Sequence, residues 1–541
     1  MIAINTEGEL TAFALALVGD DGEFSPAERQ LAARSKRKPA RSTMTAVRSA
    51  ITAGSDPLGT ALTALRSPAL RRQSGAIYTP GAIVKSMMAW AAREATPSRV
   101  VDPGTGSGRF LIAAASQFPH ARLIAVELDP LAAVILRANL AVLGLTTRAQ
   151  VLVADYRAAD IQATTGKTLF IGNPPYVRHH AIGEQWKAWY ARSAAAFGVR
   201  ASTLAGLHLH FFLRTLQLGQ KGDFGVFITA AEWLDVNYGD ALRRLLGGRL
   251  GGAALHVLEP AATPFGDTLT TGAITCFRID RRPAAMRVRS VPNIDALNGL
   301  SSGEPVPWNK LRKASRWSVI VRPSPGHPAG YIELGELFRV RRGQVTGSNA
   351  VWIAGEHAKG LPESVLKPTV TKARELLNAG DALAVADRLK RVVDLPVELD
   401  ELDTPDRRAV NRFLRWAKAQ GAADSYIAKH RRAWWSVLLY EPAPIICTYM
   451  ARRPPAFVRN LCGAHHLNIA HGLYPRDQLD EPTITALLTY LRQHVRLSAG
   501  RTYAGGLTKF EPKELERIPV PALEALKNDF GTAMDTRAIH R

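Results

Sequence analysis

The sequence is short of cysteine and has no long apolar run. Only three cysteines occur, at positions 276, 447 and 462, in no metal-ligand spacing. We therefore expect a reducing, cytoplasmic environment and no metal site. No apolar run reaches the length of about 18 residues that a membrane span needs. The first residues, MIAINTEGEL, also lack a basic segment followed by an apolar one, so we expect neither secretion nor membrane insertion.

Acidic residues are also scarce relative to basic ones. The 541 residues include 47 Asp and Glu against 69 Lys and Arg, which gives a net charge of +22. A genomic preference for Arg contributes to this excess but does not explain why acids are so outnumbered. Because Lys and Arg displace counterions from nucleic acid, the composition predicts a polyanionic partner.

The hydrophobic pattern changes along the chain and predicts several parts. Hydrophobic residues make up 46% of the sequence, enough for two or more domains. Residues 1–70 read as a helical extension, and 71–285 alternate short Val/Ile/Leu runs with amphipathic stretches, which is typical of an α/β parallel sheet. An Arg, Pro, Ser and Gly-rich linker is predicted for 286–330. Residues 331–541 read as mixed α/β, with helical patterns near 365–440 and turn-rich pieces at 331–355 and 445–520.

Four predicted strands end in polar residues. The strands are SRVVD, ARLIAVELD, VLVAD and TLFIGN, and their polar ends are Asp102, Glu127 to Asp129, Asp155 and Asn173. Ligands of an open α/β sheet bind beyond the carboxyl ends of the strands. We therefore expect these side chains to converge on one crevice.

A Gly-rich turn, VVDPGTGSGRF, follows the first of these strands. It contains Gly104, Gly106 and Gly108, which allow positive φ and close approach to a ligand. The third Gly comes one residue earlier than in the dinucleotide fingerprint, and Asp102 opens the loop. A carboxylate there would repel a pyrophosphate but suits an ammonium group.

The acids of the next two strands extend this interpretation. Glu127 can accept both hydroxyls of a ribose, and Asp155 can accept a hydrogen bond from an adenine amino group. These acids could instead only cap the helices that follow, but three in register with a Gly turn fit that explanation poorly. Together they suit S-adenosylmethionine better than NAD or ATP.

Three motifs in a fixed order carry a family resemblance. AIYTP, DPGTGSG and NPPY resemble the amino-methylating DNA methyltransferases of the gamma order, similar to the TaqI and Eco57I enzymes. The resemblance implies a Rossmann-like class I methyltransferase sheet, S-adenosyl-L-methionine as cofactor and a C-terminal target-recognition domain. It also implies cofactor roles for Tyr78, Thr79 and Pro80 at the methionine part, Asp102, Gly104, Gly106 and Gly108 at the amino-acid end, Glu127 at the ribose, Asp155 at the adenine, and Phe110 or Leu128 at the ring faces. Asn173 is expected to contact the cofactor as well.

The NPPY motif explains how an adenine amino group could be methylated. The side-chain oxygen of Asn173 and the carbonyl of Pro174, held by Pro175, can accept the two hydrogens of this weakly nucleophilic nitrogen. Tyr176 would stack on a base flipped out of the duplex, and the resemblance suggests Phe265, on a looser match, as a second clamp. Asn in the first position favours adenine N6 over cytosine N4 as a family correlation.

The C-terminal half carries two further segments of the resemblance. LGELFRVRRGQVTGSNAVWI (334–353) and RTYAGGLTKFEPKELERIPVP (501–521) resemble the start and the end of the family's target-recognition region. Any one of these cations, taken singly, is better explained as a solvated surface charge. As a set they predict DNA contacts by Arg341, Arg342, Lys509 and Lys513, together with Arg178 and His179 after NPPY.

The resulting expectation is a site-specific DNA adenine N6-methyltransferase of a restriction-modification or related system. We expect double-stranded DNA as partner, a monomer, association with the nucleoid when DNA is bound, and a nuclease, if any, on a separate chain. The segment before AIYTP is too short for a fused nuclease and lacks a P-D followed by E-x-K. Open alternatives are an N4-cytosine DNA methyltransferase and an RNA-base or protein-glutamine methyltransferase, since NPPY also marks those enzymes.

Overall fold

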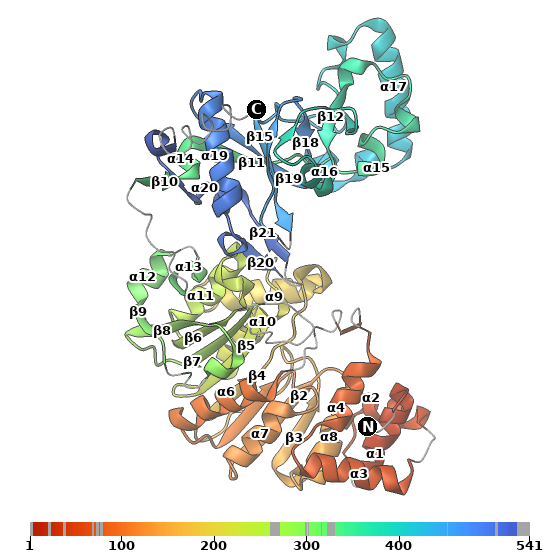
Figure 1. Cartoon of the computed structure of the whole chain (residues 1–541). Coiled ribbons are helices and arrows are strands. Elements are labelled where there is room, and N and C mark those ends of the chain that lie inside the picture. Colours follow the sequence, from red (N-terminus) through yellow and green to blue (C-terminus); the bar gives the residue numbers. More distant parts are fainter. Residues whose placement is uncertain are drawn as a thin grey trace. The chain divides into compact units, whose positions relative to one another are not determined.

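The chain forms two compact units, Met1–Ser324 and Pro325–Arg541 (Figure 1). The computed structural model describes residues 4–19, 23–35, 39–67, 70–71, 75, 79–259, 271–297, 300, 302–314, 316–321, 330–451, 453–503 and 507–526.

A nine-stranded sheet forms the centre of the first unit. Its strand order is β3-β2-β1-β4-β5-β7-β6-β8-β9, and β3, β2, β1, β4 and β5 run parallel. The central strands are buried on both faces, which explains why they read as continuous apolar runs. The strands are β1 (Arg99–Pro103), β2 (Arg122–Glu127), β3 (Ala149–Val153), β4 (Thr168–Gly172), β5 (Phe224–Ala230), β6 (Gly252–Leu258), β7 (Gly272–Arg278), β8 (Ala285–Val291) and β9 (Glu304–Pro307).

Helices cover both faces of this sheet. One face packs against α6, α7 and α8, and the other packs against α9 to α13 (Figure 1). The helices of this unit are α1 (Glu7–Val18), α2 (Pro26–Arg34), α3 (Arg41–Thr52), α4 (Pro57–Leu65), α6 (Gly81–Glu94), α7 (Arg109–Gln117), α8 (Pro130–Val142), α9 (Glu184–Ala195), α10 (Leu207–Leu218), α11 (Asp240–Leu246), α12 (Trp308–Lys313) and α13 (Ser318–Val321).

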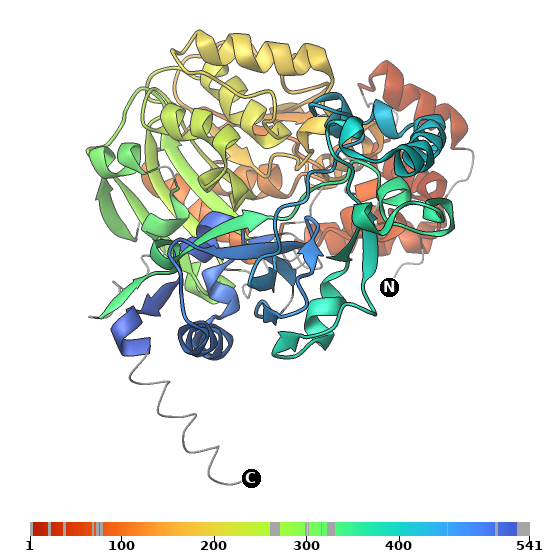
Figure 2. The same ribbon diagram turned by 90° about the horizontal axis from the view of Figure 1, so that it is seen from above.

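The N-terminal helices α1 to α4 pack on α8. Leu10, Val47, Ile51 and Leu58 of these helices share a hydrophobic cluster with Val134 and neighbouring residues of α8. Figure 2 shows the four helices, in red, grouped at one side of the first unit. The prediction of a helical extension at the N-terminus agrees with this arrangement.

The predicted linker at 286–330 is wrong for most of its length. β8 and β9 add two strands to the sheet, and α12 and α13 pack on one of its faces. Along β8, Met286 and Val288 are buried whereas Arg287 between them is exposed. This alternation is the mark of an outer strand. Because the segment is rich in Arg, Pro and Ser, its composition favoured a linker over a strand.

The second unit is a mixed α/β structure. Its five-stranded sheet has the order β11-β19-β15-β17-β13, and smaller sheets are formed by β14-β12-β18, β16-β21-β20 and β10-β22. The strands are β10 (Tyr331–Glu333), β11 (Phe338–Arg342), β12 (Leu366–Val370), β13 (Ala382–Leu383), β14 (Lys390–Val393), β15 (Ile445–Thr448), β16 (Met450–Ala451), β17 (Phe457–Asn460), β18 (His465–His466), β19 (Ala470–Pro475), β20 (Arg501–Tyr503), β21 (Leu507–Lys509) and β22 (Pro519–Pro521).

The helices of the second unit differ in part from the sequence expectation. The stretch 365–440, predicted as helical, contains β12 to β14 as well as helices, and the predicted turn-rich stretch 445–520 contains the 14-residue helix α19. The helices are α14 (Leu334–Leu337), α15 (Asn349–Trp352), α16 (Ala373–Asn378), α17 (Thr404–Ala419), α18 (Tyr426–Lys429), α19 (Glu481–His494) and α20 (Pro512–Glu516). Among the described residues, no helix is both long and apolar enough to cross a membrane.

Candidate active site

The Gly-rich turn connects β1 to α7 at the carboxyl edge of the sheet. Gly106 has a φ of 59°, and apart from Gly106 and its two chain neighbours no atom of the described residues lies within 4 Å of the place where a Cβ would stand, so the loop is open on that side. Gly108 caps α7 with a φ of 98°, and a Cβ there would lie 2.4 Å from Cδ1 of Leu136. Glycine is thus needed at Gly108 for both backbone conformation and space, as the sequence predicted for this turn.

Asp102 lies at the end of β1 beneath this turn. Its side chain is fully buried, and neither carboxylate oxygen makes a hydrogen bond of ordinary geometry to the described residues. Burial raises the pKa of Asp102 well above its ordinary value, and the neighbouring Glu127 carboxylate raises it further, against a smaller opposing effect of the Leu111 N–H. A ligand could contact its oxygens only after the covering atoms shift, so the predicted contact with an ammonium group stays a prediction.

Glu127, at the end of β2, is partly exposed and receives two backbone hydrogen bonds. Its Oε2 accepts from the N–H of Gly106 at 2.7 Å and its Oε1 from the N–H of Asp129 at 2.8 Å. Burial raises the pKa of Glu127, and these N–H groups oppose the increase. Each carboxylate oxygen has a second lone pair, which leaves Glu127 able to accept ligand hydroxyls.

The two residues proposed for the ring faces differ in exposure. Leu128 has 67% of its surface exposed, beside Glu127, whereas Phe110 has 4% exposed and packs in the hydrophobic cluster beneath the sheet. The structure therefore favours Leu128 as a residue that a planar ligand could contact.

Asp155, which follows β3, already has a cationic partner. Its two oxygens accept from Nε and Nη2 of Arg157 at 2.9 and 2.6 Å, and the guanidinium lies 4.0 Å from the ring centroid of Trp186. Because these bonds fix the carboxylate in one orientation, any adenine contact would use its remaining lone pairs. The predicted role of Asp155 stays a prediction.

The NPPY segment follows β4 and meets both other motifs. Nδ2 of Asn173 donates a 3.0 Å hydrogen bond to Oγ1 of Thr79, in the predicted YTP motif. A Cβ on Gly104 would lie 3.3 Å from Cδ of Pro175, so the Gly-rich turn and the second proline are in close contact. Since β1 and β4 are paired in parallel, their ends bring these motifs together. Pro80 follows Thr79 as the N-cap of α6.

Tyr176 is held by a contact that the sequence analysis missed. Its backbone N–H donates to the carbonyl of Gly75 at 3.1 Å, and its hydroxyl donates to the carbonyl of Ile228 at 3.4 Å. The edge of the ring meets His208, with centroids 6.1 Å apart. Gly75 has a φ of 69°, and a Cβ there would lie 2.6 Å from the nitrogen of Tyr176. In the sequence, the only local sign of this contact is the glycine three residues before Tyr78 in GAIYTP, since a glycine allows close approach of another backbone.

Several predicted residues lie away from this cluster or outside the described residues. Tyr78 and Phe265 belong to the latter. Arg178 is exposed, and His179 follows it in a short 3-10 turn. No group of three or more His, Cys, Asp or Glu side chains within the described ranges could hold a metal ion.

In the second unit the predicted cations lie on separate elements. Arg341 and Arg342 are on β11, where the Arg341 guanidinium lies over the rings of Tyr440 and Tyr474 and that of Arg342 over Tyr449. Lys509 ends β21, and Lys513 is exposed on α20. Their predicted contacts with DNA stay predictions.

The sheet order, the Gly-rich turn after β1 and the Asn-Pro-Pro-Tyr after β4 define a class I methyltransferase. The catalytic unit thus has the α/β architecture expected from the sequence. Among solved structures, the Type IIL restriction-modification enzyme MmeI in complex with DNA is similar, with a TM-score of 0.58 and 13% sequence identity over 96% of this chain and 77% of that chain. At this identity the likeness shows the fold alone.

Comparisons with known sequences identify the family of methyltransferases to which the chain belongs. A family model for the C-terminal domain of the Type II methyltransferase M.Eco57I matches residues 328–539, and one for the Eco57I restriction-modification methylase matches residues 145–248. The Type II methyltransferase M.XamI of Xanthomonas campestris pv. amaranthicola is 54% identical over 537 residues, 97% of this chain and 100% of that protein. M.AccI of Acinetobacter calcoaceticus, another Type II methyltransferase, is 21% identical over 83% of this chain and 85% of that protein. The chain belongs to the Eco57I-like type II restriction-modification methyltransferases.

Proposed function

We propose that this methyltransferase transfers a methyl group from S-adenosyl-L-methionine to the N6 amino group of an adenine flipped out of duplex DNA. The observation that carries the proposal is the anchored amide of Asn173 at the end of β4, beside the Gly-rich turn. An acceptor that is already oriented needs no reorganisation when charge develops on the target nitrogen.

The chain's own groups would act on the target amino group. The hydrogen bond from Nδ2 of Asn173 to Thr79 fixes which edge of the amide is presented, and the carbonyl of Pro174 lies in a backbone stiffened by two prolines. Both oxygens are acceptors for the two amino hydrogens. They would draw the lone pair out of conjugation and stabilise the positive charge that forms on nitrogen.

The site suits a cationic nucleoside ligand. Asp102 and Glu127 are carboxylates with raised pKa values, so a positive charge nearby would stabilise both in their ionised forms. Glu127 and the exposed Leu128 would hold the ribose and one face of the adenine. When bound, S-adenosyl-L-methionine supplies an electrophilic methyl group on a sulfonium.

The charge distribution supports DNA as the substrate. Helix α17 buries Val410, Phe413 and Ala417 and exposes a row of cations that form no ion pair with any described residue, namely Arg408, Arg412, Arg415 and Lys418. Such a row suits a phosphate backbone. MmeI was solved in complex with DNA and shares the fold. Tyr176, partly exposed, would stack on the flipped base at a cost of a few kcal/mol for unstacking.

The test uses isotopically labelled S-adenosyl-L-methionine and unmethylated genomic DNA, followed by digestion to nucleosides. We expect label in N6-methyladenine with the wild type and with Asn309→Ala, an exposed asparagine of α12, and none with Asn173→Ala. Label in N4-methylcytosine would overturn the choice of base. Label in RNA or protein extract, without transfer to DNA, would overturn the choice of polymer.

A further inference from the structure

Helix α4 of the N-terminal extension contacts the loops of the candidate donor site at both of its ends. Asp56 is its N-cap and Arg66 its C-cap. The first reaches the Gly-rich turn, and the second reaches the turn that follows Glu127. No sequence motif marked either residue, because their partners lie far away in the chain.

Asp56 joins the extension to two motifs at once. Its Oδ2 accepts from the hydroxyl of Ser107 at 2.6 Å and from Nε of Arg109 at 3.3 Å. Nη1 of Arg109 in turn donates to the carbonyl of Thr79 at 3.1 Å. Thr79 is the residue that accepts from Asn173. A continuous set of polar contacts therefore leads from the extension to the catalytic amide.

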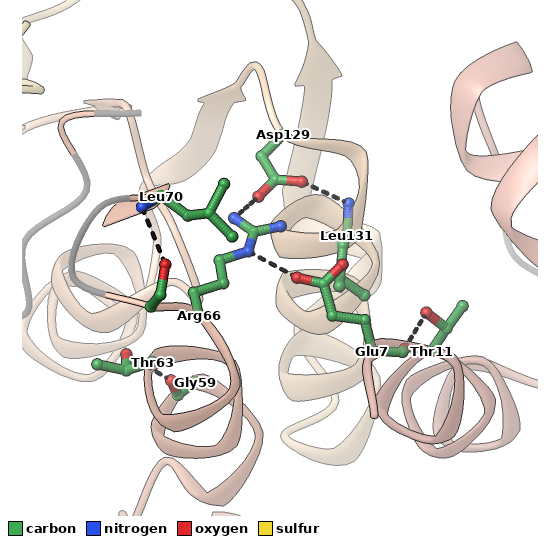
Figure 3. Close-up of polar contacts among 9 residues, drawn as sticks. Glu7, Thr11, Gly59, Thr63, Arg66, Leu70, Asp129 and Leu131 are labelled. Carbon is green, nitrogen blue, oxygen red and sulfur yellow. Dashed lines mark hydrogen bonds and ion pairs between the residues drawn. The ribbon is translucent and has the colours of Figure 1, made fainter. Parts of the chain in front are cut away.

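Arg66 holds the opposite side of the site (Figure 3). Its guanidinium donates to Oε1 of Glu7 at 2.9 Å and to Oδ2 of Asp129. Asp129 caps α8 through Leu131 and donates its own N–H to Glu127. Fixing Asp129 therefore fixes a hydrogen-bond donor of the predicted ribose-binding carboxylate.

The extension also has contacts with α8 that do not involve Asp56 or Arg66. A separate hydrophobic cluster binds α1, α3 and α4 to α8, and the buried Glu28 of α2 pairs with Arg137 of α8 at 2.7 Å. By contrast, Asp56 has its side chain 11% exposed at the edge of the Gly-rich turn. A Cβ on Gly59 would lie 2.5 Å from Oγ of Ser107, so α4 is as close to the turn as glycine allows.

We propose that Asp56 and Arg66 are positioning residues for the methyl donor, which hold the Gly-rich turn and the Glu127–Asp129 turn in the geometry that binds it. The proposal rests on the proposed use of S-adenosyl-L-methionine. Under this proposal the N-terminal extension contributes to the donor site and does not only stabilise the fold of the first unit.

The test is calorimetric binding of S-adenosylhomocysteine to the full chain carrying Asp56→Asn. Asparagine keeps the N-cap hydrogen bond to Gly59, but its amide would turn a donor toward Arg109 and Ser107. We expect the dissociation constant to rise by about tenfold, as for loss of one charge-assisted hydrogen bond. The melting temperature and the affinity for a DNA duplex should change little.

Two further variants separate positioning from stability. Glu28→Gln removes a more deeply buried ion pair of the same extension, so it should lower the melting temperature and leave S-adenosylhomocysteine affinity unchanged. Gly59→Ala places a Cβ 2.3 Å from Oδ2 of Asp56 and 2.5 Å from Oγ of Ser107, so it should displace this pair and weaken S-adenosylhomocysteine binding. The gain in helix propensity offsets part of the loss at the N-cap, so the melting temperature should fall less than with Glu28→Gln.

The outcomes also distinguish the two proposals. If the wild type binds no S-adenosylhomocysteine, the proposed function fails. If the wild type binds it and Asp56→Asn binds it equally well, the positioning role is wrong. If affinity falls in all three variants in proportion to the melting temperature, the extension only stabilises the fold and the inference is overturned.

Discussion

Thr79 contacts both Asn173, whose amide is proposed to accept from the target amino group, and Arg109. Its Oγ1 accepts from Nδ2 of Asn173 at 3.0 Å, and its carbonyl accepts from Arg109. Thr79→Val keeps the shape and the carbonyl but removes the acceptor, so the amide of Asn173 loses the hydrogen bond that Thr79 provides. We expect the methyl-transfer rate in a single turnover, at saturating donor, to fall on the order of tenfold to a hundredfold, from a loss of about 1–3 kcal/mol.

The conservative control for this position is Thr79→Ser, which retains the hydroxyl. It should restore most of the single-turnover rate. Equal rates for the wild type and Thr79→Val would mean that other contacts orient the amide of Asn173.

The buried carboxylate of Asp102 should destabilise the folded protein when it is ionised. Its pKa is raised in the folded protein by burial, so the folded state binds a proton more tightly than the unfolded state. Stability is therefore lost as pH rises from the ordinary value of 3.8 through the raised folded pKa. Asp102→Asn should raise the melting temperature of the first unit, Met1–Ser324, by roughly 1–2 °C, the change expected for about 1 kcal/mol at an unfolding entropy of about 2.1 cal/mol/K per residue.

The pH dependence of the melting temperature tests whether burial of the Asp102 charge causes this instability. The gain in melting temperature from Asp102→Asn should be larger at pH 8 than at pH 5, measured by scanning calorimetry without ligand. A gain independent of pH would show that charge burial is not its origin.

The residues of the candidate site that could be predicted are those that follow strands. Asp102, Glu127 and Asn173 each stand where an apolar run ends, and parallel pairing brings such ends together. Asp56 and Arg109 could not be found in this way. The hydrogen bond between Asp56 and Ser107 spans 51 positions and depends on how α4 docks, which no local pattern encodes.

At the scale of elements, the sequence predicted buried parallel strands better than outer strands and isolated helices. The central strands are continuous apolar runs, whereas β8 alternates Met286 and Val288 with arginines, a pattern that also fits a polar linker. Helix α19 contains several threonines, which have low helix propensity. Its N-cap Asp480 was the local signal that a helix begins there.

The exposed row of cations on α17 leads to a prediction about salt. If Arg412 and Arg415 neutralise one phosphate each, the double variant Arg412→Gln, Arg415→Gln should make the slope of log K against log salt concentration less steep by about 2. The loss of affinity should be similar for cognate and unrelated duplexes, since phosphate contacts carry no sequence information. Titrations of a labelled duplex at several salt concentrations would measure both.

The matched control on the same helix is Arg407→Gln. Arg407 already pairs with Asp400 at 2.7 Å, so its loss should change the slope less. An unchanged slope in the double variant would exclude α17 from the DNA interface.

At the scale of the whole molecule, the two units have separate hydrophobic cores. The clusters of the first unit end at Val321, and those of the second begin at Tyr331. The described residues that form the candidate donor site belong to the first unit, from Asp56 to Tyr176. Binding at that site should therefore stabilise the first unit alone.

Scanning calorimetry of the full chain should accordingly resolve two transitions. S-adenosylhomocysteine at about 100 times its dissociation constant should add about 2.7 kcal/mol to the unit that binds it, raising one transition and leaving the other in place. At the same ligand concentration, the Asp56→Asn variant should show a smaller shift of the same transition. Its dissociation constant is larger, so bound ligand adds less to the free energy of unfolding. A single transition that moves as a whole would mean that the two units unfold together, so that each core depends on the other for its stability.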